Sequence, residues 1–266
     1  MRNISDKKRI VIKLGTSTLA HKTGKLNLRR MTELVSIIAD LHKNGREIII
    51  VSSGAMGLGF GKIGLREKPN DTPTKQAVAA IGQCKLMSVY GDMFERYSIN
   101  VAQILLTKTV IENGRRKNVE NTLEKLLEFG VIPIVNENDT VAIDELELEI
   151  GENDTLSAIV AVLSKADLLV ILSDIDGLYT CDPNKNPDAK PITVVEEITS
   201  EIENMAGGAG SHLGTGGMAT KINAARIATE YGIDMVILNG RNPNNLYDLF
   251  DGMEIGTIFK AKYGKE

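Results

Sequence analysis

The fold is decided by the stretch Arg9-Ile10-Val11-Ile12-Lys13-Leu14, which ends at Gly15. Its apolar residues are mostly β-branched, so the stretch predicts a short strand that is buried on both faces. Strands of this kind belong to parallel sheets that are covered by helices. Lys13 is the exception, because a lysine inside an apolar strand is costly unless it reaches solvent at the strand end or meets an anion.

Helix-like and strand-like segments alternate along the rest of the chain. Apolar residues recur at helical spacing from Leu28 to Leu41, and Asn44-Gly45 supplies a stop signal. The further expected helices are 74–97, 118–129, 156–163 (capped by Asp154 or Thr155) and 218–231, and the further expected strands are 47–51, 101–106, 131–135, 168–172, 234–238 and 257–259. This alternation predicts the α/β class, as a three-layer αβα sandwich with a mainly parallel central sheet.

The composition excludes several classes of protein. The 266 residues carry 31 Lys and Arg against 35 Asp and Glu, and 42% are hydrophobic, so neither a disordered chain nor a basic nucleic-acid binder is expected. No apolar run is long enough to cross a membrane, and residues 1–9 lack the apolar core of a signal peptide. Two cysteines, Cys84 and Cys181, are too few for a disulfide framework, which favours free thiols and a cytoplasmic location.

Polar residues and glycines follow five of the expected strands. They are 13–17, 52–54, 136–139, 173–174 and 239–240. Ligands of open α/β sheets collect outside the carboxyl ends of the strands, so these segments predict one shared pocket.

A glycine-dense segment, 54–64, follows the second expected strand. Gly59 to Gly64 matches GxGxxG, but the match does not start directly at the strand, and no strand ending in an acid lies about 20 residues further on. We interpret the segment as a flexible loop or a helix cap. A Walker A motif is also absent, because Met56 stands where its first glycine would be and Ile63 follows Lys62.

The second glycine-rich segment is Gly214-Thr215-Gly216-Gly217-Met218-Ala219-Thr220-Lys221. Glycines let backbone N–H groups approach an anion, and the helix that follows points its positive end at it. The segment indicates a phosphate site, or alternatively a mobile loop with a solvated lysine. Lys13 and Lys221 could flank a phosphoryl group in transfer, since catalysis of that step is mostly positioning and electrostatic stabilisation.

Two Asn-Asp pairs, Asn138-Asp139 and Asn153-Asp154, occur at a strand end and a helix start. They are either ordinary caps or groups that bind the amino and carboxyl groups of an amino acid. The acidic residues at 144–149 are expected to form a solvated hairpin. The three histidines show no metal-ligand spacing, so no metal site made of protein side chains is predicted.

Together these motifs resemble the amino acid kinase family. The motifs that carry the resemblance are VIKLGTS (11–17), VSSGA (51–55), NEND (136–139), GEND (151–154), SDIDGLY (173–179) and GTGGMATK (214–221). They occur in the family's order along nearly the whole chain. NEND, GEND and GTGGMATK in combination resemble the members that act on free glutamate, although Glu152 stands where many of them have Asp.

The resemblance implies one kinase domain over 1–266 that phosphorylates the γ-carboxylate of L-glutamate with ATP, the first step of proline biosynthesis. Residues 1–165 would bind the amino acid and 166–266 the nucleotide. Transfer would be direct, with Mg²⁺ held mainly by the nucleotide phosphates.

By the same resemblance, each motif residue takes a role. The catalytic residues would be Lys13, Lys221 and Asp154, which orients the lysines. The substrate would be held by Ser53, Gly54, Asn138, Asp139 and Asn153. ATP would contact Lys13, Gly15, Ser173, Asp174, Thr215, Gly216, Gly217, Met218, Ala219, Thr220 and Lys221.

The resemblance also implies a cytoplasmic homo-oligomer, a dimer or tetramer, that binds neither nucleic acid nor membranes. Proline would inhibit it, and a glutamyl phosphate reductase would be its functional partner. The RNA-modification-type (PUA) domain that many bacterial members carry after the kinase is expected to be missing here. Two alternatives stay open: a kinase of this fold for acetylglutamate, aspartate, carbamate or UMP, and a non-catalytic nucleotide-binding or storage protein.

Overall fold

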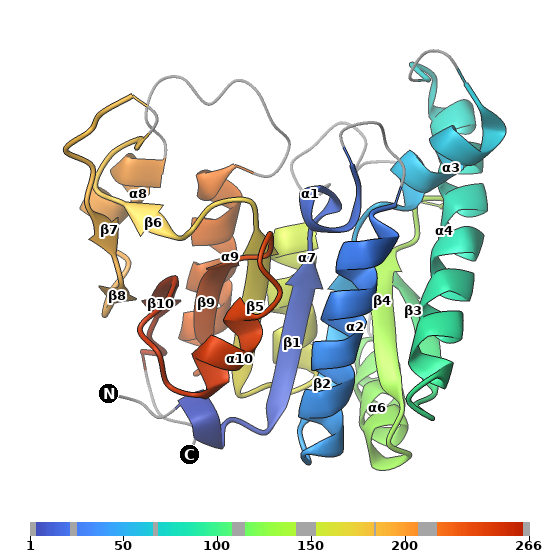
Figure 1. The fold of residues 1–266 in the computed structure, drawn as a ribbon, viewed down its shortest axis with the longest axis horizontal. Coiled ribbons are helices and arrows are strands. Elements are labelled where there is room, and N and C mark those ends of the chain that lie inside the picture. The colour runs from blue at the N-terminus through green and yellow to red at the C-terminus, as the bar shows by residue number, and fades with distance from the viewer. Residues whose placement is uncertain are drawn as a thin grey trace.

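A mostly parallel sheet of eight strands runs through the centre of the molecule (Figure 1). The computed structural model describes residues 4–21, 26–65, 69–107, 115–141, 153–183, 185–206 and 217–262. In spatial order the strands are β3 (Val101–Leu106), β4 (Ile132–Glu137), β2 (Glu47–Ser52), β1 (Arg9–Leu14), β5 (Leu168–Ser173), β9 (Asp234–Asn239), β10 (Thr257–Phe259) and β8 (Val194–Val195). Strand β10 runs antiparallel to β9, while the pairs from β3 to β9 are parallel.

Helices cover both faces of the sheet, which confirms the predicted three-layer α/β architecture (Figure 1). The described helices are η1 (Ile4–Asp6), α1 (Thr16–Leu19), α2 (Leu28–Lys43), α3 (Ala55–Ile63), α4 (Thr72–Glu95), α6 (Arg116–Glu128), α7 (Asn153–Leu163), α8 (Ser200–Ala206), α9 (Met218–Glu230) and α10 (Asn245–Phe250). Helices α2, α4 and α10 pack on one face, and α6, α7 and α9 pack on the other. A separate two-stranded sheet pairs β6 (Leu178–Tyr179) with β7 (Pro191–Ile192).

Strand β1 distributes its side chains between the two faces. Ile10, Ile12 and Leu14 join the core beneath α2, α4 and α10, whereas Val11 joins the core beneath α6, α7 and α9. Because side chains alternate along a strand, Lys13 belongs to the same face as Val11. Lys13 therefore lies near the carboxyl end of β1, on the side of the sheet that α7 and α9 cover.

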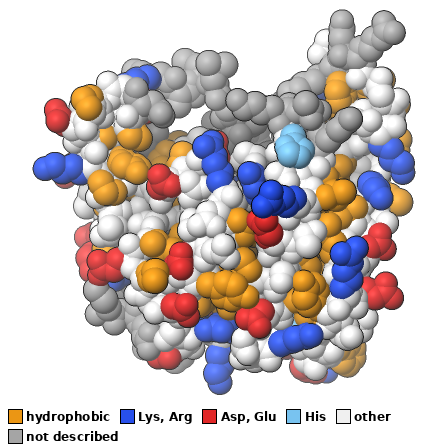
Figure 2. All heavy atoms as spheres, in the orientation of Figure 1, with side chains coloured by type: hydrophobic (Ala, Val, Ile, Leu, Met, Phe, Trp, Pro, Cys, Tyr) orange, Lys and Arg blue, Asp and Glu red, His pale blue; other side chains and the backbone are white. Residues whose placement is uncertain are grey.

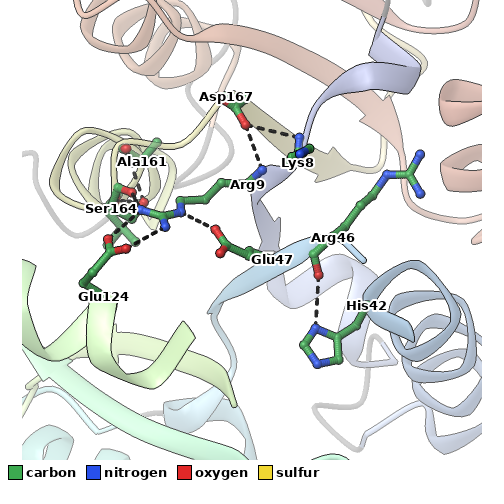
Figure 3. A network of polar contacts seen from close by, with 10 residues as sticks. Lys8, Arg9, His42, Arg46, Glu47, Glu124, Ala161, Ser164 and Asp167 are labelled. Atoms are coloured by element: carbon green, nitrogen blue, oxygen red, sulfur yellow. Dashed lines mark hydrogen bonds and ion pairs between the residues drawn. The ribbon is translucent and has the colours of Figure 1, made fainter. Parts of the chain in front are cut away.

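The opposite edge of the sheet, where β1 begins, is held by Arg9 (Figure 3). Its guanidinium group pairs with Glu47 and Glu124 and donates a hydrogen bond to the carbonyl of Ser164. Asp167 accepts the backbone N–H groups of Lys8 and Arg9. These contacts join the starts of β1, β2 and β5 to α6 and α7. The strands that carry polar groups at their carboxyl ends are therefore held in place at their other ends.

The surface outside this network is mixed in charge. On the face drawn in Figure 2, basic and acidic side chains are interspersed with hydrophobic ones. None of the helices in the described ranges is both long and apolar enough to span a membrane.

Of the two interpretations of 54–64, the flexible loop was wrong, because residues 55–63 form helix α3, whereas the helix cap is confirmed by Gly54 and Gly64, which cap that helix. Gly54 and Gly64 adopt left-handed conformations at its two ends, with φ of 101° and 74°. Inside it, Gly59 lets α3 approach α4 closely: a Cβ at Gly59 would lie 1.8 Å from the carbonyl oxygen of Val78, and a Cβ at Gly82 would lie 1.6 Å from that of Ala55. These glycines are thus explained by helix packing rather than by flexibility.

Other element boundaries also differ from the expectation. Helix α7 begins at Asn153, so Asp154 lies in its first turn instead of capping it. The short elements α1, α8, α10, β6, β7 and β8 were not predicted, since they span only two to seven residues and carry little periodicity. The acidic segment 144–149 lies outside the described residues.

Replacement of Gly82 by alanine should destabilise the protein by about 1–3 kcal/mol, the usual cost of overpacking, because its Cβ would overlap the carbonyl of Ala55. Gly61→Ala in α3 is the matched control, because a Cβ there meets nothing within 4 Å. That change should stabilise the helix by up to about 1 kcal/mol. Denaturant unfolding measures the free energy of unfolding of both variants, and equal values for the two would contradict the packing argument.

Candidate active site

Three buried charged side chains meet at the carboxyl end of β1. The ammonium of Lys13 lies 2.6 Å from Oδ1 of Asp154, and the ammonium of Lys221 lies 3.1 Å from its Oδ2. Asp154 is 0% exposed, Lys221 4% and Lys13 8%. The structure therefore joins two lysines, 208 positions apart in the sequence (221 − 13), on the two oxygens of one carboxylate.

Each member of the triad comes from a different element. Lys13 is the last residue but one of β1, Asp154 lies in the first turn of α7, and Lys221 lies in the first turn of α9. Helices α7 and α9 pack against each other with their N-terminal ends at this edge of the sheet. The positive ends of two helix dipoles therefore add to the positive charge of the site.

The triad carries a net positive charge. Burial by itself would raise the pKa of Asp154, but the adjacent ammonium groups of Lys13 and Lys221 outweigh this effect and hold the pKa below its ordinary value. The carboxylate is therefore ionised at neutral pH, and two cations face one anion. A buried excess cation is costly unless an anion completes the site.

Small and hydroxylated residues shape the surroundings of the triad. The Thr220 hydroxyl lies 3.1 Å from Oδ2 of Asp154 and 2.8 Å from the carbonyl oxygen of Gly217, so its proton is shared between these two acceptors. A Cβ at Gly15 would lie 3.3 Å from the Lys13 ammonium, tighter than an ordinary van der Waals contact. Glycine at this position therefore leaves the ammonium accessible from the side of the backbone.

A second polar cluster adjoins the triad through Asn153. Its Nδ2 lies 3.0 Å from the carbonyl oxygen of Ser52, 2.7 Å from Oγ of Ser53 and 3.1 Å from Oδ1 of Asn136. Asn136 in turn donates from Nδ2 to Oε1 of Gln83 at 2.9 Å. This row of side chains joins the ends of β2 and β4 to the start of α7 and to α4.

The hydrogen-bond direction in this cluster is determined by the backbone. The Ser52 carbonyl only accepts, so the atom of Asn153 that faces it must be the nitrogen. Ser53 then accepts from Asn153, and its own proton remains available to donate. Within the described part of the chain, Oδ1 of Asn153 has no partner, so this site offers one donor, on Ser53, beside one acceptor, on Asn153.

A third group of polar residues lies where β5 and β9 end. Ser173 Oγ donates to Oδ1 of Asp174 at 3.4 Å, and Asn239 Nδ2 donates to Asp176 at 2.6 Å. The Arg241 guanidinium lies 3.9 Å from Asp174. The backbone N–H of Gly240 donates to the carbonyl of Ser173 at 2.7 Å, which holds the two strand ends together.

The remaining sequence-predicted residues occupy varied positions. Asn138 and Asp139 are half-buried after β4, and Asn138 accepts from the hydroxyl of Thr140. Gly54 precedes α3, and Gly217 to Lys221 form the start of α9. Thr215 and Gly216 lie outside the described residues, as does Glu152.

Sequence reasoning missed the supporting residues Gln83, Tyr90 and Arg241. Tyr90 is fully buried, and its hydroxyl lies 2.9 Å from Oγ of Ser52. Gln83 and Tyr90 lie in the middle of a long helix, where nothing in the sequence distinguishes them from surface or core residues. Their spacing of seven, two helical turns, is the one available signal that they share a face.

The sequence model of the amino acid kinase family matches residues 8–239. The chain is 55% identical to the glutamate 5-kinase of Clostridium perfringens over 98% of both chains. It is 52% identical to that of Clostridium tetani, over 97% of this chain and 96% of the relative.

Solved structures share the fold at low sequence identity. A carbamate kinase from Giardia lamblia superposes with a TM-score of 0.67 at 18% identity, over 97% of this chain and 99% of that one. A UMP kinase from Ureaplasma parvum superposes with a TM-score of 0.64 at 16% identity, over 96% and 99%. The chain belongs to the amino acid kinase family, and within it to the glutamate 5-kinases.

Proposed function

We propose that this protein transfers the γ-phosphoryl group of ATP to the γ-carboxylate of L-glutamate, giving L-glutamyl 5-phosphate and ADP, the first step of proline biosynthesis. The observation that carries the proposal is the buried Lys13–Asp154–Lys221 triad, whose net positive charge calls for an anion. The identity to named glutamate 5-kinases supports the choice of acceptor.

The reaction needs positioning and charge stabilisation more than proton transfer. A carboxylate oxygen attacks the γ-phosphorus while the bond to the ADP oxygen breaks, and negative charge spreads over the equatorial oxygens. Lys13 and Lys221 would stabilise that charge, and Asp154 would keep both ammonium groups in place. A γ-carboxylate with a pKa of about 4.3 is already ionised at neutral pH, so no general base is required.

The nucleotide would enter as its Mg²⁺ complex. Among the described residues no cluster of three or more His, Cys, Asp or Glu side chains is arranged to hold a metal. The phosphate oxygens are ligands that suit Mg²⁺, which usually keeps several waters. We place ATP against Ser173, Asp174 and the 215–221 segment, with residues 166–266 as the nucleotide half and 1–165 as the acceptor half.

The cluster around Asn153 fits an amino acid as acceptor. A free amino acid presents a carboxylate, which accepts hydrogen bonds, beside an ammonium, which donates them. The Ser53 hydroxyl can donate to that carboxylate, and Oδ1 of Asn153 can accept from that ammonium. Gly54, Asn138 and Asp139 lie at the same ends of the strands and would complete this site.

The enzyme would be a cytoplasmic homo-oligomer. Proline would inhibit it, and a glutamyl phosphate reductase would consume its product.

The reaction is tested by measuring ADP release with a panel of acceptors. L-Glutamate should support turnover, whereas acetylglutamate, aspartate, carbamate and UMP should not. Glutarate lacks the ammonium and 4-aminobutyrate lacks the α-carboxylate, so each should react much more slowly than glutamate. Turnover with UMP or acetylglutamate in place of glutamate would reassign the substrate, and nucleotide binding without turnover would indicate a non-catalytic protein.

Lys13→Ala and Lys221→Met should each lower kcat by roughly 10²–10³ or more, the scale for losing one preorganised charge-stabilising donor. The exposed Lys125 supplies the control, and Lys125→Ala should leave kcat unchanged. Steady-state kinetics with saturating ATP and glutamate measure the effect. Near-normal turnover in either variant would remove that lysine from the reaction.

Asp154→Asn should cost about 3–5 kcal/mol at neutral pH, because it leaves two buried ammonium groups without their counter-ion. The pKa of Asp154 is lowered by folding, so its contribution to stability is complete above the unfolded pKa of about 3.9 and is lost as pH falls through the folded value. The stability gap between wild type and variant should therefore narrow below about pH 4. Urea unfolding at pH 3 to 7 measures the gap, and a gap independent of pH would contradict the ionised carboxylate.

A further inference from the structure

Gln83 lies on the buried face of α4 and carries one amide group with two unequal ends. Its side chain is 8% exposed. Oε1 accepts the hydrogen bond from Nδ2 of Asn136, whereas the buried Nε2 has no hydrogen-bond partner among the described residues. Among the described residues, therefore, only the oxygen end of this amide makes a hydrogen bond.

Asn136 depends on that oxygen. The residue is 4% exposed at the end of β4, and Oδ1 faces Asn153 while Nδ2 faces Gln83. If Asn136 turned its amide over, its nitrogen would face the nitrogen of Asn153, whose direction the Ser52 carbonyl sets. Gln83 therefore satisfies the one end of Asn136 that no other described residue satisfies, and it holds Oδ1 toward Asn153.

We propose that Gln83 is a positioning residue for the acceptor amino acid. Through Asn136 it fixes the side chain of Asn153, whose Oδ1 faces the substrate ammonium. This inference rests on the proposed function, because it assumes that Asn153 contacts the acceptor. Gln83 itself touches neither the substrate nor the Lys13–Asp154–Lys221 triad, so its effect falls on acceptor binding and not on the transfer step.

Tyr90 provides an internal comparison on the same face of α4. The Ser52 hydroxyl donates to the carbonyl of Ser53 at 3.3 Å, so it accepts from the Tyr90 hydroxyl. Tyr90→Phe thus removes one buried hydrogen bond from α4, as a change at Gln83 does, but leaves the amides of Asn136 and Asn153 untouched.

The test compares Gln83→Met, Gln83→Glu and Tyr90→Phe in the full chain by steady-state kinetics of glutamate-dependent ADP release. Methionine keeps the length of the side chain and removes the acceptor oxygen. We expect the KM for glutamate to rise about five- to tenfold, the loss of roughly one hydrogen bond, with kcat and the KM for ATP within about twofold of wild type. A glutamate side chain at position 83 keeps an acceptor oxygen in either protonation state, so Gln83→Glu should retain the wild-type KM for the substrate. Tyr90→Phe should retain this KM as well.

Each other result overturns the proposal. An unchanged KM in Gln83→Met would exclude a positioning role. Equal losses in Gln83→Met and Gln83→Glu would assign the role to Nε2 instead of Oε1. Equal losses in Gln83→Met and Tyr90→Phe would show a general effect of loosening α4. Absence of glutamate-dependent turnover in the wild type is a separate outcome, which would end the proposed function itself.

If Gln83→Met does not fold, the comparison moves to Asn136→Ala with and without Gln83→Met. In the double variant both partners of the Gln83–Asn136 hydrogen bond are removed. No asparagine amide is then left unsatisfied at position 136, as it is in Gln83→Met alone. Because Gln83 acts through Asn136, the two proteins should have the same KM for glutamate. A further rise in the double variant would overturn the proposal.

Discussion

The candidate site depends on one buried carboxylate that holds two ammonium groups. Asp154 has no contact with solvent, and each of its oxygens faces a different lysine. Without it, Lys13 and Lys221 would repel each other and turn toward water. With it, both are held at fixed positions while one unit of positive charge remains unneutralised. The same contact therefore joins β1, α7 and α9 and prepares the site for an anion.

A sheet with this strand order makes such a contact possible. Strand β1 lies between β2 and β5. The chain first builds the side that holds β2, β3 and β4 and then crosses to β5 on the other side of β1, and ligands bind beside such a switch point. The alternation of β1 directs Lys13 to the face of α7 and α9, whose first turns carry the other two members. The Arg9 network holds the opposite ends of the strands, so the Lys13–Asp154–Lys221 triad lies on strands and helices that are fixed at both ends and not on surface loops alone.

Much of this arrangement was predictable from the sequence, because it follows from local patterns. The apolar strands and the helical periodicities indicated the α/β sandwich, and strand-end glycines and polar residues indicated the edge that carries the site. The misplaced features depend on tertiary contacts. The sequence alone suggests a loop at Gly59, and only the structure shows the backbone of α4 packed against it. The sequence does not distinguish Gln83 from its helical neighbours, and only the structure shows Asn136 beside it. Asp154 resembles a helix cap in sequence, and only the approach of two distant lysines shows its different use.

The glycine contact between α3 and α4 has a mechanical consequence. Backbone meets backbone at Gly59 and Gly82, so the two helices cannot slide past each other without a clash. Gly54 lies directly before α3, next to Ser53, and α4 carries Gln83, which is the residue after Gly82. The two helices are therefore expected to move as one rigid unit. A displacement of α3 would therefore also displace Gln83 and, through its hydrogen bond, the Asn136 side chain.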